Sequence, residues 1–283
     1  MKATFIKPQL AKDGSDEGVA MGDSRFIAEP KIDGHRGQIH IRNRKPVAVF
    51  SRRGNNKVSS YGLRWIQEID WKVDEAVLDV ELYSGSGVNG DAAAVATELA
   101  RGHVKVALFD LLSLEGIPLV RTRSWQYRRD MLEHVFRDFN RVPYTANHQL
   151  LWDEWVVKSK GEGIILKRKN SLYIPGKRSS SWLKMKHEET VDVVITGVID
   201  EPSNGIEYRT GEVALTFGFW DPSANRAKTT GQGVMVGSRK ELTTYVGRVA
   251  ELLCNDVAPD AALRHHRFVQ WRDDKTPDEC VRN

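Results

Sequence analysis

The stretch between Phe26 and Arg42 constrains the fold of this chain more than any other. An apolar run, Phe26 to Ala28, leads into the string EPKIDGHR at 29–36, and the alternating run QIHIR follows it. Apolar runs and two-residue alternation predict strands, and Gly34 permits a turn, so we expect Lys31 at a strand-turn-strand junction. A lysine there can act as a nucleophile if desolvation or nearby cations keep its amine neutral. Taken alone, the same string is typical of a solvated turn.

Length and composition bound the remaining possibilities. With 283 residues, 40% hydrophobic and 28% charged, the chain is expected to form two globular domains. The formal charge of +4 is compatible with a polyanionic partner. Only Cys254 and Cys280 are present, which excludes a disulfide framework and a four-cysteine zinc module. Without a signal-like start or a long apolar stretch, a soluble intracellular protein is expected.

A glycine motif offers a competing interpretation. The string GSGVNG at 85–90 follows a predicted strand at 76–82, and Asp110 lies about 20 residues further on, as in a dinucleotide-binding fingerprint. Strands of that fold are buried on both faces and are nearly all apolar. Here Asp79 and Glu81 share one strand face with Val77, so we interpret the glycines as a surface loop.

Three later strings carry side chains that can serve a site. LFD at 108–110 contains Phe109, either a core aromatic or a platform for a base. EGIIL at 162–166 places Glu162 between glycine and an apolar strand. In WLKMK, Trp182, Lys184 and Lys186 share one strand face, where two lysines can meet one phosphate chain or protect a solvated strand edge. Helices are predicted over 91–100, 122–138 and 146–159.

The pattern changes near residue 190. Short strands are predicted over 191–198, 212–220 and 267–271, with a loop rich in glycine, threonine and lysine over 227–237 and one helix over 239–253. Short strands with one helix suit a small OB-like barrel. The fold is therefore expected to be α+β with two domains.

Eight strings in order carry a family resemblance. They are KPQLA (7–11, the weakest), KIDGHR (31–36), SRRG (51–54), LDVEL (78–82), LFD (108–110), EGIIL (162–166), WLKMK (182–186) and WRDDK (271–275). Together they resemble the covalent nucleotidyltransferases, and most closely the compact ATP-dependent DNA ligases such as those of tailed bacteriophages. The resemblance implies an antiparallel-sheet nucleotidyltransferase (adenylation) domain over 1–188 and an OB-fold domain over 189–283.

The resemblance also implies roles for the residues around a nucleotide. Lys31 would form a lysyl-AMP intermediate from ATP, with release of pyrophosphate. Glu29 would contact the adenine amino group, and Phe109 would stack on the base. Arg36 and Arg52 would contact the ribose and the phosphate at a nick.

A metal and several cations complete the implied site. Glu81 and Glu162 resemble carboxylates of a metal site, which suits Mg²⁺ and is expected to tolerate Mn²⁺. Lys184 and Lys186 would hold the α-phosphate and neutralise the transition state. The tail motif would orient the leaving pyrophosphate through Arg272, Asp274 and Lys275.

The implied partner is nicked double-stranded DNA. The chain has no room before Lys31 for a separate DNA-binding domain, so basic loops at 42–57, 170–181 and 227–240 would bind backbone phosphates. A monomer acting in the cytoplasm, such as that of a phage host, is expected. Three alternatives remain at this point: an RNA ligase, a capping guanylyltransferase with the same KxDG lysine, or a non-catalytic nucleic-acid-binding protein. An NAD-dependent ligase is disfavoured because a cysteine-rich segment is missing.

Overall fold

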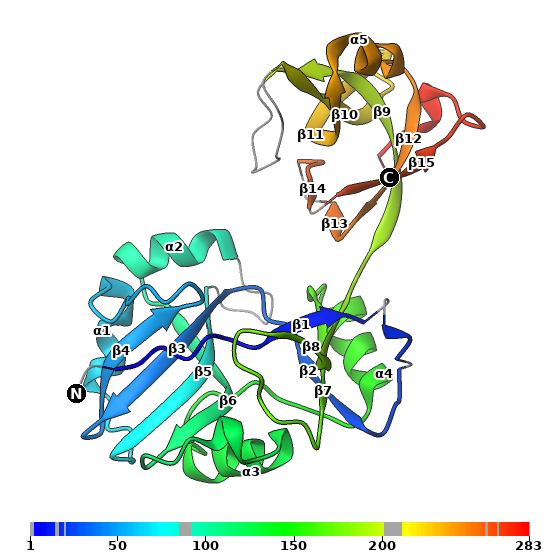
Figure 1. Ribbon diagram of the computed structural model, residues 1–283. Helices are drawn as coiled ribbons and strands as arrows, with labels where there is room; N and C mark the ends of the chain where they lie inside the picture. The colour runs from blue at the N-terminus through cyan, green and yellow to red at the C-terminus, as the bar shows by residue number, and fades with distance from the viewer. Residues whose placement is uncertain are drawn as a thin grey trace. The chain divides into compact units, whose positions relative to one another are not determined.

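The computed structural model describes residues 3–14, 17–19, 21–84, 92–200, 211–257, 260–264 and 266–282 (Figure 1). The chain divides into two compact units, Met1–Lys186 and His187–Asn283. Helices and sheets occur together, so the predicted α+β class is confirmed. No helix in the described part of the chain is long and apolar enough to cross a membrane.

The first unit contains two four-stranded sheets. One has the strand order β1 (Leu10–Asp13), β8 (Arg178–Lys186), β7 (Gly163–Arg168) and β2 (Phe26–Pro30). The other has the order β4 (Lys45–Ser51), β3 (His35–Arg42), β5 (Glu75–Tyr83) and β6 (Lys105–Leu114). The pairing of β1 with β8 is parallel, and the other pairings in both sheets are antiparallel.

Helices cover the outer faces of these sheets. They are α1 (Arg64–Glu68), α2 (Ala92–Arg101), α3 (Trp125–Val135), α4 (His148–Leu151) and a π-helical segment, Trp152–Lys158. Leu132 of α3 and Val95 of α2 pack with β3, β5 and β6, whereas Trp155 of the π-helical segment packs with β2, β7 and β8. A third cluster, including Ile27 and Phe109, joins the inner faces of the two sheets. These three hydrophobic clusters bury both faces of each sheet.

The junction at Lys31 differs from the expected turn. Residues 31–34 leave β2 in one sheet and enter β3 in the other, so the two strands are not a hairpin. Gly34 is needed for close approach: a Cβ there would lie 2.4 Å from the Leu82 carbonyl oxygen and 3.0 Å from Glu81 Oε1. Glycine thus lets the chain pass directly against β5.

The dinucleotide-binding alternative is excluded by the sheet that contains β5. Its neighbours β3 and β6 are both antiparallel to it, whereas the fingerprint requires a parallel sheet. Asp110 is buried and pairs with Arg128 through two hydrogen bonds of 2.7 and 2.8 Å, so it serves the core. The glycines at 85–90 lie outside the described residues.

The second unit is built on a five-stranded antiparallel sheet. Its order is β11 (Arg226–Ser238), β10 (Glu212–Asp221), β9 (Glu189–Ile199), β12 (Val249–Cys254) and β15 (Arg267–Trp271). A two-stranded ladder, β13 (Asp256–Val257) with β14 (Leu263–Arg264), and a short helix, α5 (Arg239–Leu242), complete it. No ladder among the described residues joins β11 to β15, so the sheet does not close into a barrel there.

Two local predictions in this unit are wrong. The expected loop at 227–237 is strand β11, whose glycines permit close contacts: a Cβ on Gly231 would lie 2.3 Å from the Phe217 ring. The expected helix at 239–253 stops at Leu242, and Val249–Cys254 pairs instead with β9 as strand β12. In both segments, pairing with a distant strand outweighs the local pattern.

His40 predicts a pH dependence of the first unit. Burial lowers the pKa of His40 to about 4, and its Nε2 donates to Gln38 Oε1 at 2.9 Å. Because the unfolded state binds this proton more readily, stability is lost as the pH falls from about 6.5 to 4, by at most about 3 kcal/mol. Urea unfolding of wild type and His40→Gln between pH 4 and 7.5 should show a smaller acid loss in the variant. Equal losses would contradict the assignment.

Candidate active site

In the first unit, the sheet that contains β2, β7 and β8 has side chains that face the other sheet. Strands β8, β7 and β2 are neighbours, and their alternate residues stand in register. We call this set the inner face. Its rows are Lys186, Gly163 and Lys31, then Lys184, Ile165 and Glu29, then Trp182, Lys167 and Ile27. Leu183 and Met185 lie on the opposite face of the same sheet. The alternation predicted for WLKMK is therefore confirmed.

Lys31 lies at one end of the inner face beside a carboxylate. Its backbone N–H donates to the Gly163 carbonyl oxygen at 2.9 Å, and its Nζ donates to Glu162 Oε2. Lys186 Nζ lies 3.3 Å from the other oxygen of Glu162. Burial opposes ionisation of Glu162, but Lys31 and Lys186 outweigh it and lower the pKa of Glu162. Lys184 pairs with Asp13 of β1 at 3.0 Å.

The facing strand β5 contributes a second carboxylate. Burial raises the pKa of Glu81 to about 8, against the opposing effects of Lys31 and Arg36. Glu81 and Glu162 both interact electrostatically with Lys31. The described residues contain no group of three or more metal-ligating side chains. Two carboxylates without further protein ligands fit Mg²⁺, which keeps waters and binds phosphate oxygens in its other positions.

Arg36 is held by a buried network that the sequence did not reveal. Its Nε and Nη2 donate to Asp79 at 2.9 and 2.5 Å, Nη1 donates to the Gln9 carbonyl oxygen, and Nη2 also donates to the Tyr173 hydroxyl. Tyr173 in turn donates to Asp79 at 2.9 Å. Burial opposes the charge on Arg36, but Asp79 leaves its pKa raised. The network fixes the direction of Arg36 and leaves it few N–H groups for a substrate.

Phe109 packs against Trp182 beside the inner face. Its ring meets Trp182 edge to face at 6.3 Å, and Lys167 Nζ lies 4.5 and 4.4 Å from the centroids of the two rings. Lys167 pairs with Glu29 at 2.6 Å. Glu29 is 2% exposed, and its Oε1 has no hydrogen-bond partner among the described atoms. Burial raises the pKa of Glu29 and lowers that of Lys167. Oε1 lies 3.7 Å from Arg129 Nη1, beyond hydrogen-bond distance, so it can serve as an acceptor for an amino group.

The other predicted site residues lie elsewhere. Arg52 is exposed in the turn after β4, where the Gly54 N–H donates to the Ser51 carbonyl oxygen at 2.8 Å. The tail residues belong to the second unit: Arg272 lies 3.1 Å from Asp192 Oδ1, and Lys275 donates to the same carboxylate.

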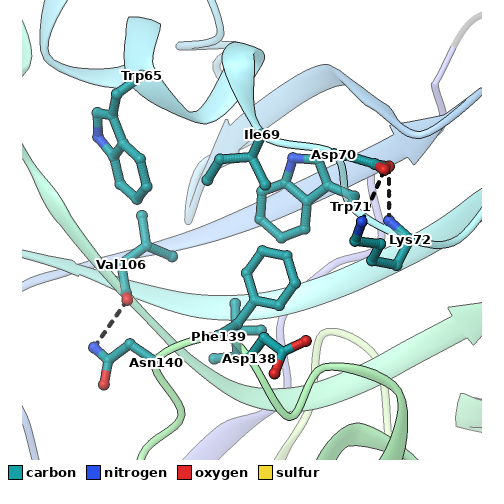
Figure 2. Close-up of a pocket in the computed structure, with 10 residues that line it drawn as sticks. Trp65, Ile69, Asp70, Trp71, Lys72, Val106, Asp138, Phe139 and Asn140 are labelled. Carbon is teal, nitrogen blue, oxygen red and sulfur yellow. Dashed lines mark hydrogen bonds and ion pairs between the residues drawn. The ribbon is translucent and has the colours of Figure 1, made fainter.

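A separate cleft lies on the opposite side of β6 from Phe109. Its volume is about 370 Å³, and Figure 2 shows the rings of Trp65, Trp71 and Phe139 around it. Val106 and Leu108 also line it. Asn140 donates to the Val106 carbonyl oxygen at 3.0 Å (Figure 2). No inner-face residue lines it, so the cleft is distinct from the candidate site.

Comparisons with known proteins agree with this arrangement. Residues 8–186 match the sequence model of the ATP dependent DNA ligase domain. DNA ligase 1 of Korarchaeum cryptofilum is 27% identical over 325 residues, covering 97% of this chain and 58% of that protein. The multifunctional non-homologous end joining DNA repair protein LigD of Mycobacterium tuberculosis is 30% identical over 323 residues, covering 98% of this chain and 40% of that protein.

A solved structure extends the similarity to three dimensions. Mycobacterial DNA ligase D complexed with ATP and MES has a TM-score of 0.58 and 25% identity, with 98% of each chain covered. The chain therefore belongs to the ATP-dependent DNA ligase family. It spans between 20% and 58% of the length of the curated relatives that it matches.

Proposed function

We propose that this protein seals nicks in duplex DNA with ATP through a covalent lysyl-AMP intermediate. The observation that carries the proposal is the convergence of Lys31, Glu162 and Lys186 at one end of the inner face, beside Glu81. This arrangement supports the use of Lys31 as the nucleophile, of the two carboxylates as metal ligands and of Lys186 as a phosphate-binding cation. The family match and the ATP-bound relative support the same chemistry.

In the first step, Lys31 Nζ attacks the α-phosphorus of ATP. A nitrogen–phosphorus bond forms, the bond from the α-phosphorus to the oxygen that bridges to the β-phosphate breaks, pyrophosphate leaves with that oxygen, and the amine's proton passes to water. Before the attack, Lys31 must lose a proton and leave Glu162, because an ammonium has no free electron pair. Lys184 and Lys186 stabilise the charge that develops on the phosphate. Glu81 and Glu162 would hold Mg²⁺, which supplies charge neutralisation at the phosphates.

The nucleotide is bound by the remaining residues of the face. Phe109 stacks on the base, and Glu29 accepts a hydrogen bond from its amino group after leaving Lys167. Arg36, already fixed by Asp79, contacts the ribose, and Arg52 contacts the nick phosphate. In the second step the 5′-phosphate of the nick takes AMP from Lys31. In the third the 3′-hydroxyl attacks that phosphate and releases AMP.

We further propose that the first unit is the nucleotidyltransferase domain, with its boundary near residue 188, and that the second is an OB-fold domain. The five-stranded antiparallel sheet supports the OB assignment. Arg272, Asp274 and Lys275 would orient the leaving pyrophosphate in the first step. The chain would act as a monomer in the cytoplasm.

Nicked DNA would be bound mainly through backbone phosphates by the basic segments 42–57, 170–181 and 227–240. Phosphate contacts release counterions, so the affinity should fall steeply with salt. Filter binding of a nicked duplex should lose affinity by about 10³-fold or more between 50 and 200 mM salt if six or more phosphates are contacted. A flat salt dependence would count against backbone binding.

Nick sealing itself tests the function. Purified protein is incubated with a 5′-labelled nicked duplex, Mg²⁺ and ATP, and a matched reaction contains GTP. We expect ligated product with ATP alone. A nick in an RNA duplex, sealed in preference to DNA, would indicate an RNA ligase, and covalent labelling from GTP would indicate a capping enzyme. Absence of any covalent labelling would favour a binding protein.

A further inference from the structure

Two cations of the tail motif share one carboxylate in the second unit. Arg272 Nη1 lies 3.1 and 3.3 Å from the two oxygens of Asp192, and Lys275 Nζ donates to Asp192 Oδ2. Asp192 is on β9, about 80 residues before the motif, and its side chain is 17% exposed. From this geometry we infer that Asp192 is a positioning residue that aligns Arg272 and Lys275 for the pyrophosphate leaving group. The inference deepens the proposed function and depends on it.

The backbone of the tail motif is anchored by contacts that do not involve Asp192. The backbone N–H of Arg272 donates to the Val249 carbonyl oxygen at 2.9 Å, and that of Lys275 donates to the Arg272 carbonyl oxygen at 3.2 Å. Trp271 stacks on Tyr245 at 4.7 Å, and Arg248 lies over Trp271 at 4.4 Å. These contacts hold the segment in place without Asp192. What Asp192 adds is the direction of the two cationic side chains.

Both cations keep donors for an anion. Arg272 also donates through Nε and Nη2 to Asp274, at 2.9 and 2.8 Å. These bonds and those to Asp192 use only part of its five N–H groups. Lys275 has three N–H groups, and its bond to Asp192 uses one. The side chains of Arg272 and Lys275 are 22% and 32% exposed, so a phosphate can reach them. Holding them in one geometry lowers the entropy lost when they bind the leaving group.

Glu251 provides a matched control. It lies on β12 directly opposite Asp192 in the register of the paired strands, and it also carries one negative charge. Its Oε2 accepts a hydrogen bond from Gln270 at 2.6 Å. Glu251→Gln therefore removes the same charge from the same neighbourhood, while Asp192→Asn removes the carboxylate that holds both cations.

The experiment measures separate steps in the full chain. For wild type, Asp192→Asn, Asp192→Glu and Glu251→Gln, we would measure the rate of covalent labelling by α-labelled ATP across ATP concentrations. Sealing of a nick that already carries 5′-AMP would be measured in parallel. We expect Asp192→Asn to lower the maximal labelling rate by about tenfold to a hundredfold, because two charge-assisted bonds are weakened. The apparent KM for ATP should change by less than about threefold.

Two rates are expected to stay close to those of the wild type. Sealing of the pre-adenylated nick by Asp192→Asn should stay within about threefold of wild type, since no pyrophosphate leaves in that step. Asp192→Glu should recover part of the labelling rate, and Glu251→Gln should match wild type. The inference is overturned by wild-type labelling in Asp192→Asn, by equal losses in both steps, or by an equal loss in Glu251→Gln. Absence of labelling in wild type would instead overturn the proposed function.

Discussion

Replacing Lys31 by alanine is expected to abolish covalent labelling by ATP, with a loss on the order of 10⁴-fold or more, as for removal of a nucleophile. Lys186, the other inner-face lysine beside Glu162, lies 3.3 Å from that carboxylate and is proposed to hold the α-phosphate instead. Lys184 is paired with Asp13, and Lys167 is buried against Glu29 and the aromatic rings. Denaturing electrophoresis after incubation with α-labelled ATP and Mg²⁺ measures the effect.

Lys31→Arg is the matched control for charge. It keeps a cation beside Glu162 but has no amine that loses its proton near neutral pH, so it should also fail to label. Because the Lys31 side chain is 25% exposed, both variants should fold, and thermal unfolding verifies this. Labelling of Lys31→Ala at a tenth of the wild-type rate would place the nucleophile elsewhere.

Replacing Asp79 by asparagine is expected to destabilise the first unit by about 3–5 kcal/mol, because it leaves a buried cation without its counterion. Asp79 is fully buried, and Arg36 donates two hydrogen bonds to it. The Tyr173 hydroxyl would also lose its charged acceptor. Urea unfolding followed by tryptophan fluorescence measures the change.

Asp70→Asn is the control for this variant. Asp70 accepts two hydrogen bonds from Arg44 and two from Lys72, but it is exposed, so water replaces the lost contacts. Its removal should change the unfolding midpoint little. Equal midpoints for Asp79→Asn and Asp70→Asn would show that the buried network contributes no more than a surface ion pair.

The features that were predictable from the sequence are those that depend on the alternation of side chains along a strand. Asp79 and Glu81 on one face of β5, and Trp182 opposite Leu183 on β8, follow from a period of two residues, and the core clusters confirm both. The position of Lys31 directly after a strand was also predictable. The roles assigned to these side chains remain predictions until the experiments above are done.

Features that depend on distant partners were not predictable. Arg36 and Tyr173 are 137 positions apart, and nothing local indicates that they meet at Asp79. Lys167 follows EGIIL as an ordinary strand lysine, yet it is buried against Glu29. The wrong assignments at 227–237 and 239–253 have the same cause, because β11 and β12 are defined by their pairing with β10 and β9. Gly34 was expected for its turn, but its role is to admit the Leu82 carbonyl oxygen.

The central claim is that AMP passes from ATP through Lys31 to a nick. The most direct measurement isolates wild-type protein labelled with α-labelled ATP, removes free nucleotide, and adds nicked duplex DNA with Mg²⁺ in a single turnover. The account predicts that label leaves the protein, appears transiently on the 5′-phosphate of the nick, and is released as AMP while the strand is sealed. Label that stays on the protein with nicked DNA present, or discharges equally with intact duplex, would contradict it.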